Sequence, residues 1–371
     1  MSALVRYVLD ARAATSHFPG IGRYVINLAR AMTPLLGGDE RLVLLRDPTQ
    51  LSPWDLKALA GERVQVIDVP LSPFSPRQQW GIPRLLRRCQ AGLYHSPYYS
   101  MPYLPGVPTV LTVYDLIPLR YPQYVSAQAR LLFRWMTALA LRAAAYVIAI
   151  SQVTRRDLLT TYHPPSERVT AIPLAADPAF RPQSPEAVTA LRVRLNLPDQ
   201  YVLYLGINKP HKNLVRLIEA WAAISYQLVV AGYWDPRYPQ AQERARQLSL
   251  EGCVRFLGPV AEEDLPALYS GATCFVFPSL YEGFGLPVLE AMSCGAPVVC
   301  SDTSSLPEIV GGAALTFDPL DVTEMAAKIE EALGDEALRG EMREQGLRQA
   351  AKFSWERTAR ETLRVYREAA S

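Results

Sequence analysis

The stretch PSLYEGFGLPVLEAMSCGAPVV, residues 278–299, decides the fold class of this chain. It follows the apolar run TCFVF directly, and a short run rich in aromatic and β-branched residues is typical of a buried strand. Pro287 suits the first turn of a helix, and Gly295 suits the residue after a helix end. The stretch therefore predicts a strand, a loop and a short helix over residues 287–294.

Short apolar runs of the same kind alternate with longer helical patterns along the chain. This rhythm is typical of parallel sheets with helices on both faces, and it predicts an α/β fold. The runs that we assign to strands are LVRYVLD (4–10), VQVIDV (64–69), TVLTVYD (109–115), AYVIAIS (145–151), RVTAIP (168–173), YVLYLG (201–206), YQLVVAG (226–232), CVRFLG (253–258), TCFVFPS (273–279) and PVVCSD (297–302).

Chain length and one proline-rich break predict two domains. A chain of 371 residues is longer than a single hydrophobic core usually supports. The segment DPAFRPQSPEAV (177–188), with three prolines, is typical of a linker. We predict Rossmann-like domains at 1–180 and 181–353 that face a shared cleft, because open parallel sheets bind ligands at the carboxyl ends of their strands. A terminal helix at 354–371, capped by Ser354, is expected to pack back on the first domain.

The charge balance and the cysteines limit the class of protein. Lys and Arg number 38 and Asp and Glu 36, so the net charge of +2 lacks the positive excess of duplex-binding proteins. We therefore expect no nucleic acid partner. The five cysteines are scattered and never form a Cys-x-x-Cys pair, which indicates reduced thiols in a cytoplasmic protein.

Neither the N-terminus nor the most apolar segment resembles a membrane or export signal. The start, MSALVRYVLDARAA, lacks a basic stretch followed by a long apolar run, and it is interpreted as a first strand. The segment 131–150 is interrupted by Arg134 and Arg142, whose burial in a bilayer would be costly. It is better explained as a helix that runs into a strand.

The loop GFGL and two nearby glutamates give residues 278–299 the chemistry of a binding site. Phe284, Gly285 and Leu286 stand where backbone N–H groups at a helix N-terminus favour an anion such as a diphosphate. Glu290, in the helix, can accept hydrogen bonds from ribose hydroxyls, and Glu282, at the loop mouth, from a transferred sugar. For an isolated pair of glutamates, a capping Glu and a surface Glu would be the commoner explanation.

The whole stretch resembles the Glu, seven residues, Glu signature of the retaining glycosyltransferase family four, with Glu282 and Glu290 at its two positions. The match includes the intervening GFGLPVL and the trailing AMSCGAPVV. The resemblance implies a GT-B fold, in which two Rossmann-like domains face a cleft. It also implies an enzyme that transfers a hexose from a nucleotide diphosphate sugar with retention, as group 1 bacterial mannosyltransferases do.

Two lysines follow the strand YVLYLG of the second domain. Lys209 and Lys212 stand just before a helix, where two ammonium groups suit a leaving diphosphate whose charge grows as the glycosidic bond breaks. The family carries an Arg near the strand end and a Lys before Asn or Gly; Lys212 matches the second, and Gly206 or Ile207 occupies the region of the first. A solvated lysine is the ordinary alternative for either residue.

Two segments of the first domain supply further candidates. Gly20 and Gly22, placed immediately ahead of a helix, allow the backbone to approach a phosphate of the donor or an acceptor, although an ordinary turn is at least as common for such a loop. The segment resembles the family's GIGRY loop, which favours the donor contact. Tyr114 and Asp115 end the strand TVLTVYD where the family has His then Asp, and the family's His approaches the donor sugar. The resemblance therefore implies that the Tyr114 phenol either replaces this donor contact or that the contact is lost, and it implies a catalytic role for Asp115. His95 is interpreted as a structural histidine, because a ring at a strand end easily finds hydrogen-bond partners.

No metal or other cofactor is expected. The chain has no Asp-x-Asp pair and no His-rich cluster, so lysines and helix dipoles must supply the positive potential at a diphosphate. The resemblance favours GDP-mannose as donor, with UDP-glucose and related UDP-hexoses as alternatives. Front-face substitution is the favoured mechanism, in which the leaving phosphate helps to remove the acceptor proton.

The acceptor that the resemblance implies is a saccharide or a lipid-linked sugar in polysaccharide assembly. The basic aromatic segment around Arg77–Arg88 can rest on anionic lipid at the inner membrane face, although a solvated helix face is the more frequent outcome for such a run. Two other functions are weighed. A glycosidase that uses Glu282 and Glu290 is disfavoured by their separation. A non-catalytic subunit that binds nucleotide sugar is the second alternative.

Overall fold

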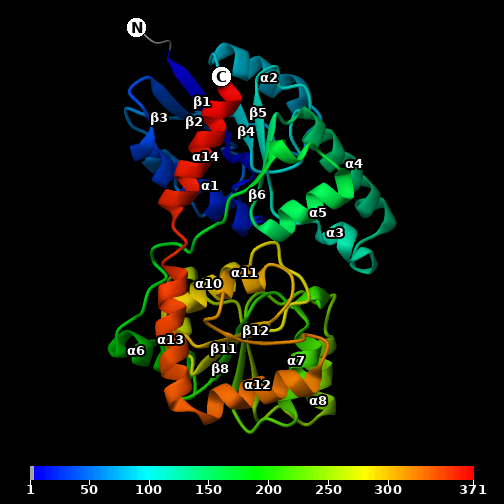
Figure 1. Ribbon diagram of the computed structural model, residues 1–371, viewed down its shortest axis with the longest axis vertical. Coiled ribbons are helices and arrows are strands. Elements are labelled where there is room, and N and C mark those ends of the chain that lie inside the picture. Colours follow the sequence, from blue (N-terminus) through cyan, green and yellow to red (C-terminus); the bar gives the residue numbers. More distant parts are fainter. Residues whose placement is uncertain (1–3) are drawn as a thin grey trace. The chain divides into compact units, whose positions relative to one another are not determined.

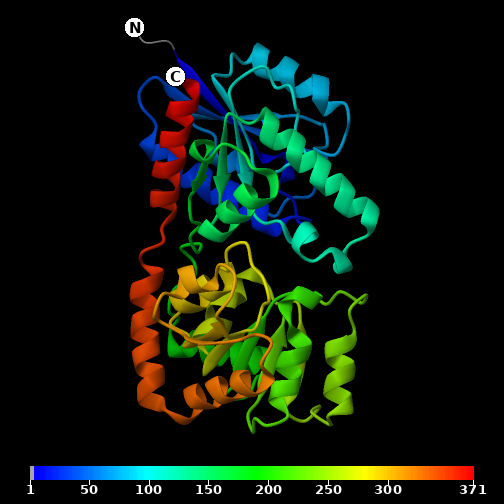
Figure 2. The same ribbon diagram turned by 45° about the vertical axis from the view of Figure 1, so that its right-hand side comes forward.

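The computed structural model describes residues 4–371, which form two compact units (Figure 1). The first unit runs to Leu174 and takes in Ser354–Ser371, and the second unit is Ala175–Phe353. Each unit has a parallel sheet with helices on both faces (Figure 2). The prediction of two Rossmann-like parallel-sheet domains is therefore confirmed.

The described part of the first unit contains a seven-stranded sheet in the order β3-β2-β1-β4-β5-β6-β7, and all its neighbours pair in parallel. Its strands are β1 (Val5–Asp10), β2 (Glu40–Arg46), β3 (Val64–Asp68), β4 (Leu93–Ser96), β5 (Thr109–Val113), β6 (Tyr146–Ala149) and β7 (Val169–Ala171). Its helices are α1 (Pro19–Met32), α2 (Gln78–Arg88), α3 (Ile117–Arg120), α4 (Ala127–Ala143), α5 (Gln152–Tyr162) and α14 (Trp355–Ala370).

The two faces of this sheet pack on different helices. Val8, Tyr94 and Leu111 share a buried apolar cluster with residues of α2 and α4. The opposite face meets α1 and the C-terminal helix α14, which contacts α1, β4, β5 and β6. Ser354 caps α14 by accepting a hydrogen bond from the N–H of Arg357, as the sequence predicts. The C-terminal helix thus belongs to the first unit although the second unit precedes it in the chain.

Within residues 175–353, six strands form the second parallel sheet, in the order β10-β9-β8-β11-β12-β13. Its strands are β8 (Val202–Leu205), β9 (Leu228–Ala231), β10 (Val254–Gly258), β11 (Cys274–Phe277), β12 (Val298–Ser301) and β13 (Leu315–Phe317). Its helices are α6 (Pro185–Leu195), α7 (Leu214–Trp221), α8 (Gln240–Gln247), α9 (Leu265–Ser270), α10 (Leu286–Ser293), α11 (Leu306–Val310), α12 (Val322–Gly334) and α13 (Glu336–Ala350).

The linker expected over residues 177–188 is wrong in its last four residues, because α6 begins at Pro185. Ser184 caps this helix by accepting a hydrogen bond from the N–H of Ala187, and proline is favoured at the first helical position. The prolines therefore start a helix instead of extending a linker. The other helix predicted from prolines, over residues 287–294, is found one residue earlier, as α10.

Both sheets reverse their strand order next to their first strand. In the second unit β8 lies between β9 and β11, and in the first unit β1 lies between β2 and β4. Such a reversal leaves a crevice at the carboxyl ends of the two central strands, because the connecting loops leave in opposite directions. The loops after β8 and β11, and those after β1 and β4, are therefore the places where each unit can build a site.

Candidate active site

The loops after β8 and β11 bring Lys212 and Glu282 together. The Nζ of Lys212 donates to Oε1 of Glu282 at 2.6 Å, and both side chains are mostly withdrawn from water, with exposed fractions of 14% and 10%. The same ammonium group lies 5.3 Å from the centre of the Phe277 ring, over its face. This pairing follows from the topology, since β8 and β11 are neighbours although their sequences are far apart.

Two serines after β12 fix the backbone of Glu282. The N–H of Glu282 donates to Oγ of Ser304 at 3.0 Å, and that hydroxyl donates to the Glu282 carbonyl at 2.6 Å. The buried hydroxyl of Ser305 lies 3.0 Å from the Glu282 carbonyl and 2.6 Å from that of Phe284. Sequence reasoning missed both serines. Their signal is their position, because they follow the strand that neighbours β11 in the sheet.

The GFGL loop needs its second glycine. Gly285 has φ +108° just before α10, and a Cβ there would stand 2.7 Å from Cδ2 of Leu306. The Phe284 side chain is buried and meets Phe353 edge-on, so only its backbone could face a ligand. Leu286 is the first residue of α10, and the N–H groups of a first helical turn lack partners within the helix. The diphosphate contact assigned to this loop remains a prediction, and the N–H groups of that first turn are the donors that would make it.

Glu290 lies in the body of α10 and is almost completely buried. Its Oε2 accepts a hydrogen bond from the Tyr269 hydroxyl at 3.1 Å, and Tyr269 is itself buried. A buried carboxylate needs such partners, because burial without them would be costly. The hydrogen bond to Tyr269 gives Glu290 a structural role. The ribose contact assigned to Glu290 remains a prediction, and the two roles are compatible.

The segment after β8 places two lysines around a buried imidazole. Burial lowers the pKa of His211 from its ordinary 6.5 to about 3, and the charges of Lys212 and Lys209 add to that effect. The side chain of Asn208 holds the loop after β9 by donating to the carbonyls of Asp235 and Tyr238. His211 therefore stays neutral at physiological pH, and the positive charge of this segment is carried by the lysines.

The two candidate glycines, Gly20 and Gly22, lie inside α1 and not ahead of it as expected. The helix begins at Pro19, which suits its first position, so Gly20 and Gly22 belong to its first turn. A Cβ on Gly22 would stand 2.0 Å from the Trp54 ring, whereas one on Gly20 would meet nothing within 4 Å. Close packing on Trp54 thus accounts for Gly22. The donor contact assigned to both glycines remains a prediction.

Tyr114 and Asp115 directly follow β5. Burial raises the pKa of Tyr114 well above its usual value, its hydroxyl is buried with no hydrogen-bond partner among the described residues, and its ring meets Tyr24 of α1 edge-on. Asp115 Oδ1 accepts from the N–H of Ile117 at the start of α3. Asp115 thus has a local structural contact, and the catalytic role assigned to it stays a prediction.

His95 is confirmed as a structural histidine. It is wholly buried, its Nδ1 lies 2.6 Å from the Tyr366 hydroxyl, and its Nε2 lies 2.8 Å from Oγ1 of Thr112. Burial lowers its pKa from the ordinary 6.5 to about 3, so the ring is neutral. Because Tyr366 belongs to α14, the histidine also ties the C-terminal helix to the first sheet.

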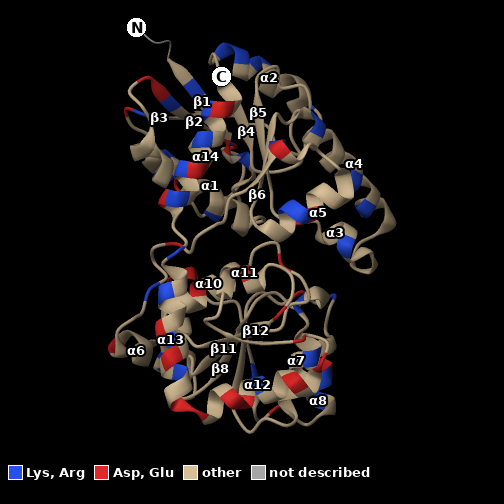
Figure 3. Cartoon of the chain, in the orientation of Figure 1, with Lys and Arg blue, Asp and Glu red and all other residues tan. Residues whose placement is uncertain are grey.

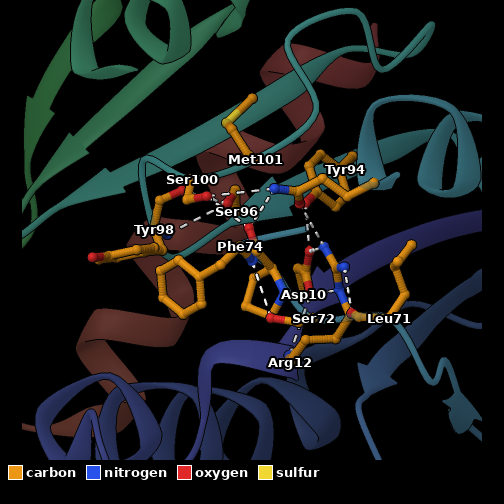
Figure 4. Close-up of polar contacts among 12 residues, drawn as sticks. Asp10, Arg12, Leu71, Ser72, Phe74, Tyr94, Ser96, Tyr98, Ser100 and Met101 are labelled. Atoms are coloured by element: carbon orange, nitrogen blue, oxygen red, sulfur yellow. Dashed lines mark hydrogen bonds and ion pairs between the residues drawn. The ribbon is translucent and has the colours of Figure 1, made fainter. Parts of the chain in front are cut away.

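Asp10 at the end of β1 and Arg12 just after it form a buried ion pair that sequence reasoning missed (Figure 4). Arg12 donates to both carboxylate oxygens of Asp10, through Nε at 2.8 Å and Nη2 at 2.6 Å, and the Tyr94 hydroxyl donates to Asp10 Oδ2 at 2.5 Å. Burial acts to raise the pKa of Asp10, but Arg12 and Tyr94 hold it below its usual range. The network also reaches Leu71 and Gln78, and it fixes the loop before α2.

Comparisons with known proteins decide the family. Two family models match, Glycosyltransferase Family 4 over residues 19–180 and Glycosyl transferases group 1 over residues 190–349. The O-antigen chain mannosyltransferase B of Escherichia coli is 36% identical over 301 residues, which are 78% of this chain and 77% of that protein. The chain is a family four glycosyltransferase. It is therefore an enzyme, a retaining hexosyltransferase of group 1.

The match to another relative spans a smaller share of that relative's length. The serotype-specific mannosyltransferase WbdA of Escherichia coli is 37% identical over 264 residues, which are 68% of the glycosyltransferase but 32% of WbdA. The relatives named here are transferases by name, and nothing among them supports a non-catalytic subunit.

Solved structures share the GT-B fold of the glycosyltransferase. Sucrose-phosphate synthase from Thermosynechococcus elongatus has a TM-score of 0.76 at 25% identity, covering 99% of this chain and 100% of that one. HepE of Anabaena, solved with UDP and glucose, has a TM-score of 0.77 at 20% identity, covering 97% and 98%. At 20% identity, the similarity to HepE shows a shared fold and nothing more.

Three further observations concern metals, membranes and thiols. Over residues 4–371, no group of three or more His, Cys, Asp or Glu side chains could hold a metal ion. No helix in that range is long and apolar enough to cross a membrane, and the segment expected to run from helix into strand is α4 followed by β6. All five cysteines are free thiols.

Proposed function

We propose that this glycosyltransferase moves mannose from GDP-mannose to a saccharide acceptor in the assembly of a surface polysaccharide. The observation that carries the proposal is the 36% identity to an O-antigen chain mannosyltransferase over 78% of the chain. UDP-hexoses are the alternative donors, since a structure with the same fold holds UDP and glucose. Nucleotide sugar and acceptor are substrates, and no cofactor is proposed.

The second unit has the groups that such a donor needs. Lys212, Lys209 and the N–H groups at the start of α10 provide positive potential for a diphosphate. Glu282 is assigned to hydroxyls of the transferred sugar, and Glu290 to the ribose. We propose that these groups act without a metal ion, because lysines and backbone dipoles can carry the charge that develops on the leaving group.

The proposed reaction is a front-face substitution. The bond between the anomeric carbon and the β-phosphate oxygen breaks, and an acceptor hydroxyl oxygen bonds to the same carbon from the same face. The hydroxyl proton passes to the departing diphosphate, so no separate base is required. Lys212 stabilises the growing negative charge of the diphosphate, which is the largest electrostatic demand of the step.

The acceptor side of the proposal includes the membrane. A lipid-linked saccharide is proposed as acceptor, with contact at the inner membrane face through Arg77–Arg88. Residues 78–88 of this segment form α2, which contains Arg84, Arg87 and Arg88 and no acidic residue, and its Trp80 is largely exposed. Basic side chains with an exposed Trp suit an interface with anionic lipid.

A donor screen tests the proposal. The purified chain is incubated with GDP-mannose, UDP-glucose, UDP-galactose and ADP-glucose, first with EDTA and then with manganese or magnesium. Thermal shift reports binding, and released nucleoside diphosphate reports turnover with a mannose oligosaccharide acceptor. Turnover of GDP-mannose in EDTA is expected. Turnover of another donor alone overturns the choice of donor, and activity that requires added metal overturns the metal-free mechanism.

A further inference from the structure

Helix α4 turns a stripe of large apolar side chains toward water. Leu131, Leu132, Trp135 and Leu139 are 57%, 60%, 63% and 44% exposed, whereas Phe133 on the opposite side is buried in the core of the first unit. At about 100° of turn per residue, the four exposed side chains lie within roughly 100° of arc. Contiguous exposed apolar side chains of this kind mark an interaction surface, whereas single exposed apolar residues need no such explanation.

The stripe continues onto the loop before β5. Leu104 is 85% exposed, and it lines a hollow of about 780 Å³ together with Leu139 and Arg142 of α4. Gln79 of α2 bonds to the same loop, through the Met101 carbonyl and the N–H of Tyr103. We call Leu104 and the four residues of the stripe the α4 surface. It therefore adjoins the N-terminal end of α2.

Positive charge accompanies this apolar surface. Residues 71–144 contain eight arginines and one acidic residue, Asp115, although the whole chain has a net charge of only +2. Arg130, Arg134 and Arg142 belong to α4, which has no Asp or Glu, and Figure 3 shows blue residues without red along this helix. A partner that covers the α4 surface must therefore accept both apolar side chains and guanidinium groups.

We propose that the α4 surface binds the surface of an anionic phospholipid bilayer. A helix that lies in a membrane interface buries Leu and Trp at the level of the headgroups, and flanking arginines meet lipid phosphates. A second copy of this chain fits less well, because a symmetric contact would bring the arginines of two α4 helices together. A bilayer can bury the apolar side chains of the stripe and can pair its lipid phosphates with the arginines of α4.

This inference adds a second lipid contact to the one proposed for Arg77–Arg88, and it does not depend on the identity of the donor. Vesicle binding can be measured without any nucleotide sugar. Turnover with a soluble saccharide acceptor can be measured without vesicles. A failure of the lipid contact is therefore distinguishable from a failure of the proposed function.

Vesicle cosedimentation tests the inference with matched variants. The triple variant Leu132→Ser, Trp135→Ser, Leu139→Ser removes most of the stripe. The control, Val193→Ser, Tyr233→Ser, Leu320→Ser, removes three side chains of the second unit that are 78%, 62% and 61% exposed. On vesicles with roughly 30% phosphatidylglycerol in phosphatidylcholine, the first variant should lose binding by on the order of tenfold, and the control by less than about twofold. Both should keep their thermal stability and soluble turnover.

A charge variant separates the two parts of the contact. Arg130→Gln, Arg134→Gln, Arg142→Gln should remove most of the preference for phosphatidylglycerol over pure phosphatidylcholine. The inference is overturned if the wild type does not bind vesicles, or if the stripe variant binds them as the control does. It is also overturned if sedimentation velocity shows that the stripe variant only converts a dimer to a monomer.

Discussion

Lys212 donates a hydrogen bond of 2.6 Å to Glu282, although 70 residues separate them in the chain. The two loops meet because β8 and β11 are neighbours at the reversal of strand order in the second sheet. The pair neutralises two charges whose side chains are mostly buried. The hydrogen bond to the carboxylate fixes the position of the Lys212 ammonium group, to which the diphosphate contact is assigned.

Replacing Glu282 should chiefly lower turnover. Glu282→Ala removes the partner of Lys212 and the charged hydrogen bond that is proposed to the reacting sugar. A loss of about 1.5–3 kcal/mol corresponds to roughly 10- to 150-fold in kcat. Glu282→Gln, which keeps the shape of the side chain, should fall between the wild type and alanine. Steady-state kinetics at saturating donor measure this. A folded Glu282→Ala enzyme with wild-type kcat removes Glu282 from the site.

Replacing Glu290 should instead weaken donor binding. Glu290→Ala is expected to raise the donor Kd by roughly 10- to 150-fold, because it removes a charged acceptor assigned to the ribose. Tyr269→Phe is the control, since it removes the 3.1 Å hydrogen bond to Glu290 and keeps the carboxylate. Isothermal titration should show near wild-type affinity for this control. Equal losses in both variants would show that Glu290 acts through the packing of α10.

The Ser305 hydroxyl should matter for both stability and turnover. Ser305→Ala leaves two buried carbonyls with one partner fewer, which costs about 1–3 kcal/mol, and it frees the loop that carries Glu282. Ser293→Ala is the matched control, because it removes a hydroxyl bond to the Leu289 carbonyl within α10. Thermal unfolding and kcat are measured for both. Identical behaviour of the two variants would refute a role for Ser305 in positioning Glu282.

Acid should destabilise the first unit through His95. Its folded pKa of about 3 lies below the ordinary 6.5, so between these values the unfolded chain binds a proton that the folded chain does not. Stability therefore falls as pH drops, by about 2 kcal/mol from about pH 7 to about pH 5. Urea unfolding of His95→Gln should show a correspondingly weaker pH dependence. An unchanged dependence would mean that the ring does not stay neutral in the folded state.

Periodicity predicts most of the strands, and the three that it misses have different causes. All ten predicted strands are present, and the described chain also contains β2, β4 and β13, which the sequence patterns do not predict. β4 ends in His95 and Ser96, which are polar yet buried, so it lacks the apolar run that marks other four-residue strands such as β8. β13 has only three residues. β2 begins with Glu40, whose carboxylate is held by Tyr7 and Arg367 from distant parts of the chain. No local pattern reports such partners.

The candidate site was predictable residue by residue, but its contacts were not. The loop around Glu282 and the helix that carries Glu290 follow from glycine and proline positions. The pairing with Lys212 and the support by Ser304 depend on strand order, which local sequence leaves open. For Gly22 the expected local structure is wrong. The glycine is expected in a ligand-binding loop, but it lies in α1, packed against Trp54.

The most direct test of the central claim is the rate of mannosyl transfer from saturating GDP-mannose by wild type and Lys212→Met, in EDTA. The methionine keeps the apolar stem and removes the charge, and turnover should fall by orders of magnitude. Because Glu282 loses its partner, some loss of stability is also expected, so folding is checked by circular dichroism. Lys212→Arg should retain part of the activity. Unchanged transfer by folded Lys212→Met would contradict the proposed site.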